Sequence, residues 1–193
     1  MSQASVLIAT DVFADTAAVS SIARYLDLQC HIVSPFDTTL FHKNEQTAYQ
    51  HFLACGGVAS YAKKITNSLR EQCQISHVIA FSVGASAWWL QCETPAPSLA
   101  SATLFYGSRI RDYPDLQAHC PTQFIFAEQE AAYPPAELVA SLRRSGHQAE
   151  IAKGTRHGFM NPYSAGFSLK AQTHYLELLG AKLRPLAYLA HAS

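Results

Sequence analysis

Ser82 is the side chain of this sequence best placed to act as a nucleophile. In the stretch HVIAFSVGASAWW, an apolar, β-branched run gives way to small residues around this serine, and a second apolar segment follows. Ala80 and Gly84 leave room for a tight strand-to-helix turn, and the helix start would direct amide groups at a developing anion. The pattern resembles the G-x-S-x-G turn, with alanine in place of the first glycine. An incidental serine at a helix N-cap would give the same pattern, so both interpretations stay open.

His157 is the candidate base. It stands in the stretch GTRHGFMNP, in a loop after the last strand-like segment, and is followed by glycine and an aromatic residue. His31 and His77 lie in other strand-like runs, where packing or surface roles are expected. The remaining histidines show no partner pattern: His42, His51, His119, His147, His174 and His191.

Two glutamates are candidates for the acid that would orient the histidine. Glu128 and Glu130 both fall in the loop expected after the apolar run TQFIFA. Either could face His157, and the other would then be a solvated carboxylate. We favour Glu130, because its later position matches the usual placement of this acid.

These three residue types could together carry out acyl transfer. A serine hydroxyl is a weak nucleophile at neutral pH, so a base must take its proton as it attacks a carbonyl. Imidazole suits that task because its pKa lies near ambient pH, and a carboxylate on the other ring nitrogen fixes the tautomer. Backbone N–H groups must then stabilise the oxyanion. The chain order of serine, acid and histidine is that of α/β-hydrolase triads.

Short apolar runs alternate with helix-like segments along the sequence. Six runs are expected to form strands: Ser5–Ala9, Cys30–Pro35, Ser76–Phe81, Ser101–Gly107, Thr122–Ala127 and Gln148–Lys153. The first expected helix is capped by Asp15 and carries Val19, Ile22 and Leu26 on one face. A long helical segment over 44–72 is expected to break at Gly56–Gly57, and a short helix passes through Trp88 and Leu90. The last two expected helices cover 134–146 and about 166–183, and the second of these carries Tyr175, Leu176, Leu178 and Leu179.

This alternation predicts the α/β class. A mostly parallel sheet would have helices on both faces, as a three-layer sandwich, and residues 1–193 would form a single α/β-hydrolase domain. Chemistry in such sheets gathers at the carboxyl ends of the strands, which Ser82, the two glutamates and His157 all follow.

Composition excludes several function classes. The 193 residues are 49% hydrophobic and 15% charged with zero net charge, so the chain has no excess of positive charge to attract nucleic acid or anionic lipid. The sequence has five cysteines: Cys30, Cys55, Cys73, Cys92 and Cys120. Their number is odd and they form no C-x-x-C pair, so we expect mostly buried free thiols, no disulfides and a reducing compartment. No signal peptide, membrane helix or metal-ligand pattern is apparent, and a soluble cytoplasmic protein, as monomer or homodimer, is expected.

Over nearly its whole length the sequence resembles the dienelactone hydrolase family. The segments that carry the resemblance are VLIATDVFADT, VIAFSVGASA, LFYGSRI, FIFAEQE and HGFMNP. The resemblance implies an oxyanion hole made by the backbone N–H groups of Val12 and Val83. It also places Glu130 where the family usually has aspartate, and Asp11 where it usually has a glutamate near the nucleophile.

The sequence departs from that family in ways that bear on the substrate. Serine stands at position 82, whereas the namesake enzyme uses cysteine, and Asn161 follows HGFM where the namesake has an arginine for its substrate's carboxylate. An anionic dienelactone is therefore not expected. Aromatic residues suggest an apolar pocket, although core packing would explain each of them equally well: Phe13, Phe36, Phe41, Trp88 and Phe159.

The sequence thus predicts a hydrolase that needs no cofactor and acts on a small-molecule ester, lactone or thioester. Ser82 would attack, His157 would move the proton and Glu130 would orient the histidine. The alternative is a non-catalytic hydrolase-fold protein with a binding or regulatory role. Ala80, the glutamate at position 130 and a start without the family's leading hairpin motivate that alternative.

Overall fold

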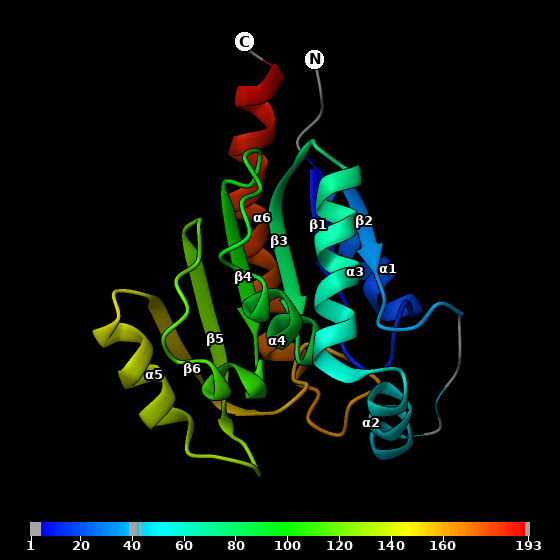
Figure 1. Ribbon diagram of the computed structural model, residues 1–193, viewed down its shortest axis with the longest axis vertical. Coiled ribbons are helices and arrows are strands. Elements are labelled where there is room, and N and C mark those ends of the chain that lie inside the picture. The colour runs from blue at the N-terminus through cyan, green and yellow to red at the C-terminus, as the bar shows by residue number, and fades with distance from the viewer. Residues whose placement is uncertain (1–4, 39–41, 43, 192–193) are drawn as a thin grey trace.

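The computed structural model describes residues 5–38, 42 and 44–191, with side chains up to residue 184. Six strands form one parallel sheet in the order β2-β1-β3-β4-β5-β6 (Figure 1). The strands are β1 (Ser5–Ala9), β2 (Gln29–Val33), β3 (Ile75–Phe81), β4 (Ser101–Phe105), β5 (Thr122–Gln129) and β6 (Gln148–Arg156). Every pairing is parallel, so all six carboxyl ends point to one edge of the sheet. This confirms the predicted α/β class.

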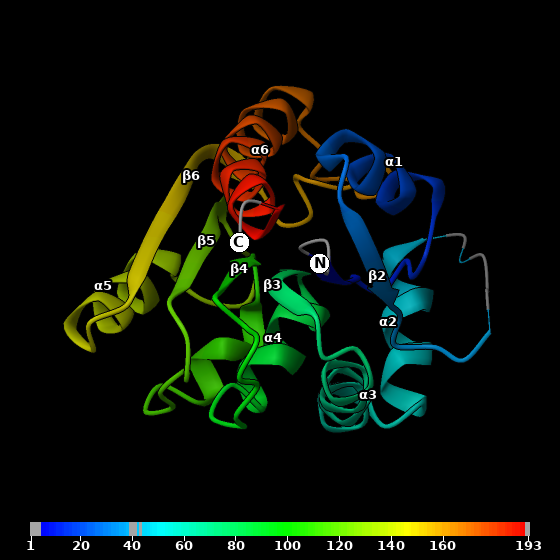
Figure 2. The same cartoon turned by 90° about the horizontal axis from the view of Figure 1, so that it is seen from above.

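Helices cover both faces of the sheet (Figure 2). On one side lie α1 (Ala17–Leu26) and α6 (Leu169–His191), and on the other α3 (Gly57–Glu71), α4 (Val83–Leu90) and α5 (Pro135–Arg144). Two hydrophobic clusters correspond to these two sides. The helix α2 (Glu45–Ala54) ends before Gly56 and Gly57, which both have positive φ, so the predicted break is confirmed.

Helix boundaries differ from the sequence-based expectation in two places. Thr16, not Asp15, is the N-cap of α1, because its backbone is extended and its carbonyl accepts the N–H of Ser20. The last helix extends beyond residue 183. Its buried side chains, Tyr175, Leu176 and Leu179 among them, occupy one arc, whereas Leu178 lies outside that arc and is 48% exposed.

The cysteines are all free, but only some of them are buried. Cys92 and Cys120 are buried and Cys30 is half-buried. Cys55 caps the end of α2 and Cys73 follows α3, and both are exposed, contrary to the expectation of buried thiols. Their positions just beyond helix ends explain the exposure, because neither residue belongs to the face of a helix that packs on the sheet.

His77 lies in a buried polar network between β3 and β4. Its Nδ1 is 2.5 Å from Ser101 Oγ and its Nε2 is 3.2 Å from Thr103 Oγ1, which also accepts from Lys182 Nζ. Burial, with a smaller effect of the Lys182 charge, lowers the pKa of His77 to about 3. The folded state therefore keeps this imidazole neutral at pH values where the unfolded chain protonates it.

We expect this histidine to make the fold sensitive to acid. Because the folded pKa lies below the unfolded value, stability is lost as pH falls below about 6.5, by about 2 kcal/mol at pH 5. A His77→Gln variant should lack this part of the loss, whatever its stability at pH 7. Urea unfolding of both proteins at pH 7 and pH 5 measures it, and an equal loss in the two proteins would contradict the assignment.

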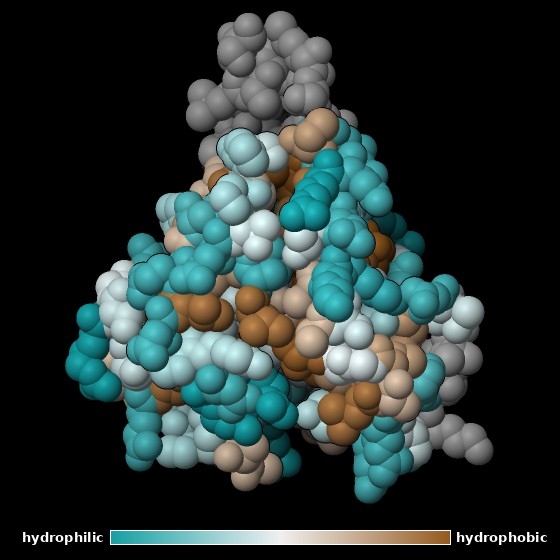
Figure 3. Space-filling view, viewed as in Figure 1, coloured by the Kyte–Doolittle hydropathy of each residue, from teal (hydrophilic) through white to brown (hydrophobic). Residues whose placement is uncertain are grey.

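On the face that carries α3, α4 and α5, hydrophobic residues lie in small groups among hydrophilic ones (Figure 3). Among the described helices, none combines the length and the apolar character that crossing a membrane requires.

Candidate active site

Ser82 stands at the sharp turn between β3 and α4. Its φ of 51° and ψ of −112° are strained for a residue with a side chain. Its N–H donates to Phe105 O on the neighbouring strand at 2.9 Å, and its carbonyl accepts the N–H of Ser86 at 3.0 Å. Bonds to both the sheet and the helix thus hold the turn in a conformation that presents the hydroxyl beyond the strand end.

Gly84 allows this turn to pack against the end of β1. A Cβ at this position would lie 2.6 Å from both the Ala9 and Thr10 carbonyl oxygens. These are backbone atoms in a sheet and its adjoining loop, so they cannot move aside easily. The glycine therefore permits close approach between the start of α4 and the loop that carries Val12.

We expect Gly84→Ala to destabilise the protein by about 3 kcal/mol, because overpacking against fixed backbone forces both segments apart. Gly180→Ala in α6 is the matched control, since its Cβ would meet only the end of the Arg184 side chain. That change should leave stability the same or slightly higher. Thermal or urea unfolding measures both, and a Gly84→Ala protein as stable as the control would contradict the close approach.

The structure brings Ser82, His157 and Glu130 into one chain of hydrogen bonds. Ser82 Oγ lies 2.8 Å from His157 Nε2. His157 Nδ1 lies 2.9 Å from each of the two carboxylate oxygens of Glu130. The three side chains follow β3, β6 and β5, whose carboxyl ends meet at one edge of the sheet. A hydroxyl, an imidazole and a carboxylate in this order can activate the hydroxyl as a nucleophile.

Carboxylates around His157 favour its protonated form. Burial alone lowers the pKa of His157, but the hydrogen bond and charge of Glu130, together with the charges of Glu45 and Asp11, outweigh it and raise the pKa above its ordinary value of 6.5. The Glu130 side chain is only 4% exposed, so solvent screens this interaction weakly. The site is thus arranged to stabilise an imidazolium.

Glu128 does not reach the histidine. Both strands run further than expected, and Gln129 at the end of β5 pairs with Arg156 at the end of β6. Glu128 therefore lies within β5, not in the loop after it, and its Oε2 accepts the N–H of Gly154 at 2.8 Å. The two glutamates thus have different partners, and Glu130, which the sequence analysis favoured, is the one that contacts His157.

The backbone N–H groups of Val12 and Val83 have no acceptor among the residues that the structure describes. Val83 is the first residue of α4, so its N–H has no acceptor within the helix. Val12 lies in the turn after β1, and in the described part of the chain neither N–H donates to another group. Because Gly84 lets these segments touch, the two amides come from adjacent pieces of backbone.

A buried carboxylate ties that turn to the histidine loop, which the sequence did not reveal. Asp11 Oδ2 accepts from Asn161 Nδ2 at 2.7 Å, and Asp11 Oδ1 accepts the N–H of Phe13 at 2.9 Å. Burial raises the pKa of Asp11 to about 6, although both hydrogen bonds act to lower it. The hydrogen bond of Asn161 with Asp11 thus fixes the position of the segment around Val12 relative to the loop of His157.

Tyr106, just after β4, buttresses the histidine. It has a positive φ of 40° and is fully buried, and its ring packs edge-on against His157 with centroids 5.0 Å apart. Gly158 has φ +80° and lies so close to Ser164 Oγ that a Cβ would clash with it. The imidazole is therefore fixed by packing as well as by hydrogen bonds.

The aromatic residues predicted to line a substrate pocket are mainly core residues. Trp88 and Phe159 have no exposed surface, so they cannot face a substrate in this conformation. Phe13 and Phe36 are 8% and 6% exposed, and Phe36 stacks on His51. Phe41 lies outside the described residues.

A cavity of about 420 Å³ opens beside His157 and is lined by a different set: Glu45, Gln129, Glu130, Ala131, Arg156, His157, Ala165 and Gly166. Among the described residues, no three His, Cys, Asp or Glu side chains are grouped so as to hold a metal ion.

Sequence comparison shows similarity to a protein over part of the chain. No family model matches the chain. An uncharacterized protein, YczH, from Bacillus subtilis (strain 168) is 34% identical over 129 residues, which span 65% of this chain and 63% of that protein.

Solved structures match over a larger part of the chain. A proposed dienelactone hydrolase from Klebsiella pneumoniae superposes with a TM-score of 0.70 at 15% identity, over 97% of this chain and 87% of that one. A dienelactone hydrolase from Anabaena variabilis gives a TM-score of 0.62 at 13% identity, over 93% and 84% of the two chains. An α/β serine hydrolase homologue from Coxiella burnetii gives 0.58 at 14% identity, over 93% and 85%. With its six-stranded parallel sheet and the sharp turn at Ser82, the chain thus has the α/β-hydrolase fold of the dienelactone hydrolase structures.

Proposed function

We propose that this protein is a serine hydrolase that cleaves a carboxylic ester, lactone or thioester. The observation that carries the proposal is the continuous chain of hydrogen bonds from Ser82 Oγ through His157 to Glu130, at 2.8 and 2.9 Å. The strained backbone of Ser82 supports the proposal, because strained residues of this kind cluster at active sites, where the surrounding contacts maintain them.

The reaction proceeds in two acyl-transfer steps. His157 Nε2 takes the proton of Ser82 as Oγ attacks the carbonyl carbon, and Glu130 stabilises the imidazolium. The Val12 and Val83 amides hold the oxyanion. His157 then passes the proton to the departing alcohol or thiol, which leaves an acyl group on Ser82. Water, deprotonated by His157, releases the acid and restores the serine.

A neutral substrate fits the surroundings better than an anionic one. The cavity beside His157 carries the carboxylates of Glu45 and Glu130 and a single guanidinium, that of Arg156. Asn161 stands in the histidine loop and is engaged by Asp11. These groups provide no cluster of cations to bind a substrate carboxylate.

The proposal is tested by assaying the pure protein on p-nitrophenyl esters of increasing acyl length, an aliphatic thioester and a neutral lactone. Turnover of at least one class, with a burst of the leaving group equal to the enzyme concentration if deacylation is slow, is expected. Spontaneous rates throughout, from a folded protein, would overturn it and favour a non-catalytic binding or regulatory role.

The pH profile of kcat/KM should show the raised pKa of His157. The base must be neutral to accept the serine proton, so activity should rise with pH through a pKa above 6.5. A Glu45→Gln variant removes one nearby carboxylate and should shift that midpoint to lower pH with little change in the plateau. An identical midpoint in the two proteins would show that Glu45 does not influence His157.

A further inference from the structure

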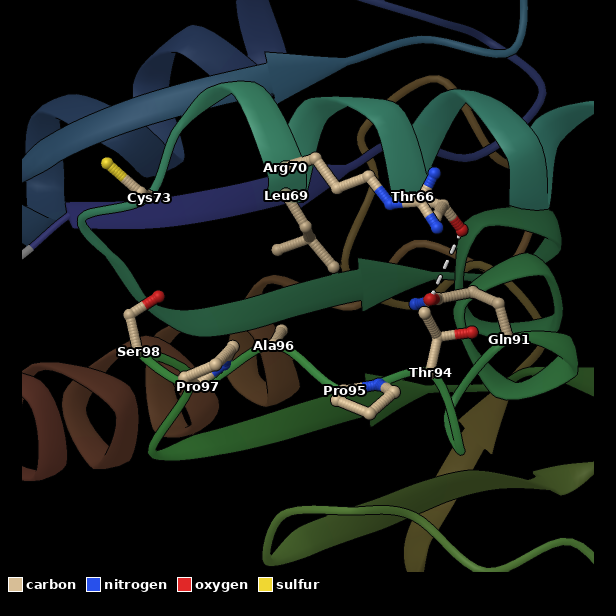
Figure 4. A pocket seen from close by; sticks show the side chains of 10 residues that line it. All are labelled: Thr66, Leu69, Arg70, Cys73, Gln91, Thr94, Pro95, Ala96, Pro97 and Ser98. Atoms are coloured by element: carbon tan, nitrogen blue, oxygen red, sulfur yellow. Dashed lines mark hydrogen bonds between the residues drawn. The ribbon is translucent and has the colours of Figure 1, made fainter.

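A second cavity of about 420 Å³ lies between α3 and the segment that joins α4 to β4 (Figure 4). Its lining comes from the last turns of α3, from Cys73 two residues beyond the end of that helix, and from the loop after α4: Thr66, Leu69, Arg70, Cys73, Gln91, Thr94, Pro95, Ala96, Pro97 and Ser98. The volume is that of a small-molecule site.

The cavity is separate from the triad. Cys73 precedes β3 and Ser98 precedes β4, whereas Ser82 follows β3. The end of the cavity at Cys73 and Ser98 lies about 20 Å from Ser82 along β3, and the end at Gln91 lies beyond the eight residues of α4, about 12 Å from Ser82 along that helix. A molecule in this cavity would therefore not touch the reacting groups.

Two polar groups in the wall have no partner within the part of the chain that the structure describes. Gln91 Nε2 is buried and has no hydrogen-bond partner, while the Oε1 of the same amide contacts Thr66 Oγ1 at 3.2 Å. Thr66 also donates to Ala62 O at 2.9 Å, and because a hydroxyl has one proton, either orientation of the amide leaves one Gln91 atom unpaired. Arg70 forms no ion pair with a described carboxylate. Figure 4 shows its side chain running along α3 in the direction of Thr66.

Much of the remaining wall is apolar, with hydroxyl groups at Thr94 and Ser98. Leu69 is 9% exposed, and Pro95, Ala96 and Pro97 form the opposite side. Proline fixes its own backbone angle, so this side loses little conformational freedom when a ligand binds. The lining thus combines one cation, one unpaired amide, a few hydroxyl groups and an apolar surface.

We propose that this cavity binds a small organic carboxylate with an apolar body. The guanidinium fork of Arg70 would pair with the carboxylate, the Gln91 amide would supply a further hydrogen bond, and the apolar body would lie on the Leu69–proline wall. Arg70 is the only charged residue among the ten that line the cavity, and the ends of α3 and α4 bring partial negative charge nearby. A single negative charge therefore suits the site better than a phosphate dianion.

Cys73 gives a direct readout, because it is an exposed thiol in the cavity wall, and exposed Cys55 at the end of α2 is an internal control. Peptide mass spectrometry measures the rate at which iodoacetamide alkylates each of the two thiols. The rates are compared in the presence of octanoate or 4-phenylbutyrate and in the presence of the corresponding neutral amides. The carboxylates should slow alkylation of Cys73 in a saturable manner and leave Cys55 unchanged, while the amides should have much weaker effects. Ser82→Ala protein should give the same result.

Arg70→Gln should weaken the protection about 10-fold or more, as expected for loss of a charged hydrogen bond. Lys63→Gln is the matched control, because Lys63 is an exposed cation two turns earlier on α3 and outside the cavity. The proposal is overturned if neither carboxylate protects Cys73, if the amides protect equally, or if the carboxylates protect Cys73 in Arg70→Gln at the same concentrations as in the parent protein.

Discussion

Replacing Ser82 by alanine should reduce ester hydrolysis by at least about 10³-fold, with kcat affected far more than KM. The three side chains act as a unit, so loss of the nucleophile removes nearly all of the covalent route. The Oγ of Ser82 already lies 2.8 Å from the base, so no rearrangement is needed before attack. Steady-state rates on the best p-nitrophenyl ester measure the effect.

The matched control for this change is Ser86→Ala. Ser86 is a buried serine one helical turn further on, where its Oγ contacts Ser82 O and accepts the N–H of Arg109. Its loss should alter stability modestly and retain most of the activity. If Ser82→Ala, folded as well as the parent, kept its rate, the nucleophile would have to lie elsewhere.

Glu130→Gln should lower kcat by about 10² to 10⁴-fold, whereas Glu128→Gln should stay close to the parent rate. The amide at position 130 would carry no charge to stabilise the imidazolium, and its NH2 group could hold His157 in the wrong tautomer. Glu128 lies two residues earlier but contacts Gly154 N. The pair therefore compares two glutamates that are close in sequence and have different partners.

The ratio of the two rates is the informative quantity. Equal losses in Glu130→Gln and Glu128→Gln would indicate a general effect on the loops after β5 and β6. A larger loss in Glu128→Gln would reverse the assignment of the acid. Aspartate at position 130 should recover part of the activity if the loop lets the shorter carboxylate approach Nδ1.

Local patterns in the sequence predicted most of the fold. Apolar β-branched runs marked the strands because a parallel sheet is buried on both faces, as the fully buried pattern of β1 illustrates. Helical spacing placed Val19, Ile22 and Leu26 on one buried face. Ser82 and His157 could be singled out because small residues around the first, and a glycine after the second, indicate tight turns after strands.

Pairings between distant segments could not be predicted. The ends of β5 and β6 carry polar residues, so only the pairing of Gln129 with Arg156 reveals that these strands continue. The contact of Asp11 with Asn161 joins positions 150 residues apart. The tight approach of Gly84 to the end of β1 and the packing of Tyr106 on His157 also depend on the assembled sheet.

Covalent labelling by a fluorophosphonate tests most directly whether the Ser82 hydroxyl is activated. The pure protein should gain one phosphonyl group per chain, with loss of fluoride, and peptide mapping should place it on Ser82. The adduct should be absent in Ser82→Ala and form much more slowly in Glu130→Gln. A folded protein that leaves Ser82 unlabelled at high probe concentration, or that carries the label on another residue, would contradict the account.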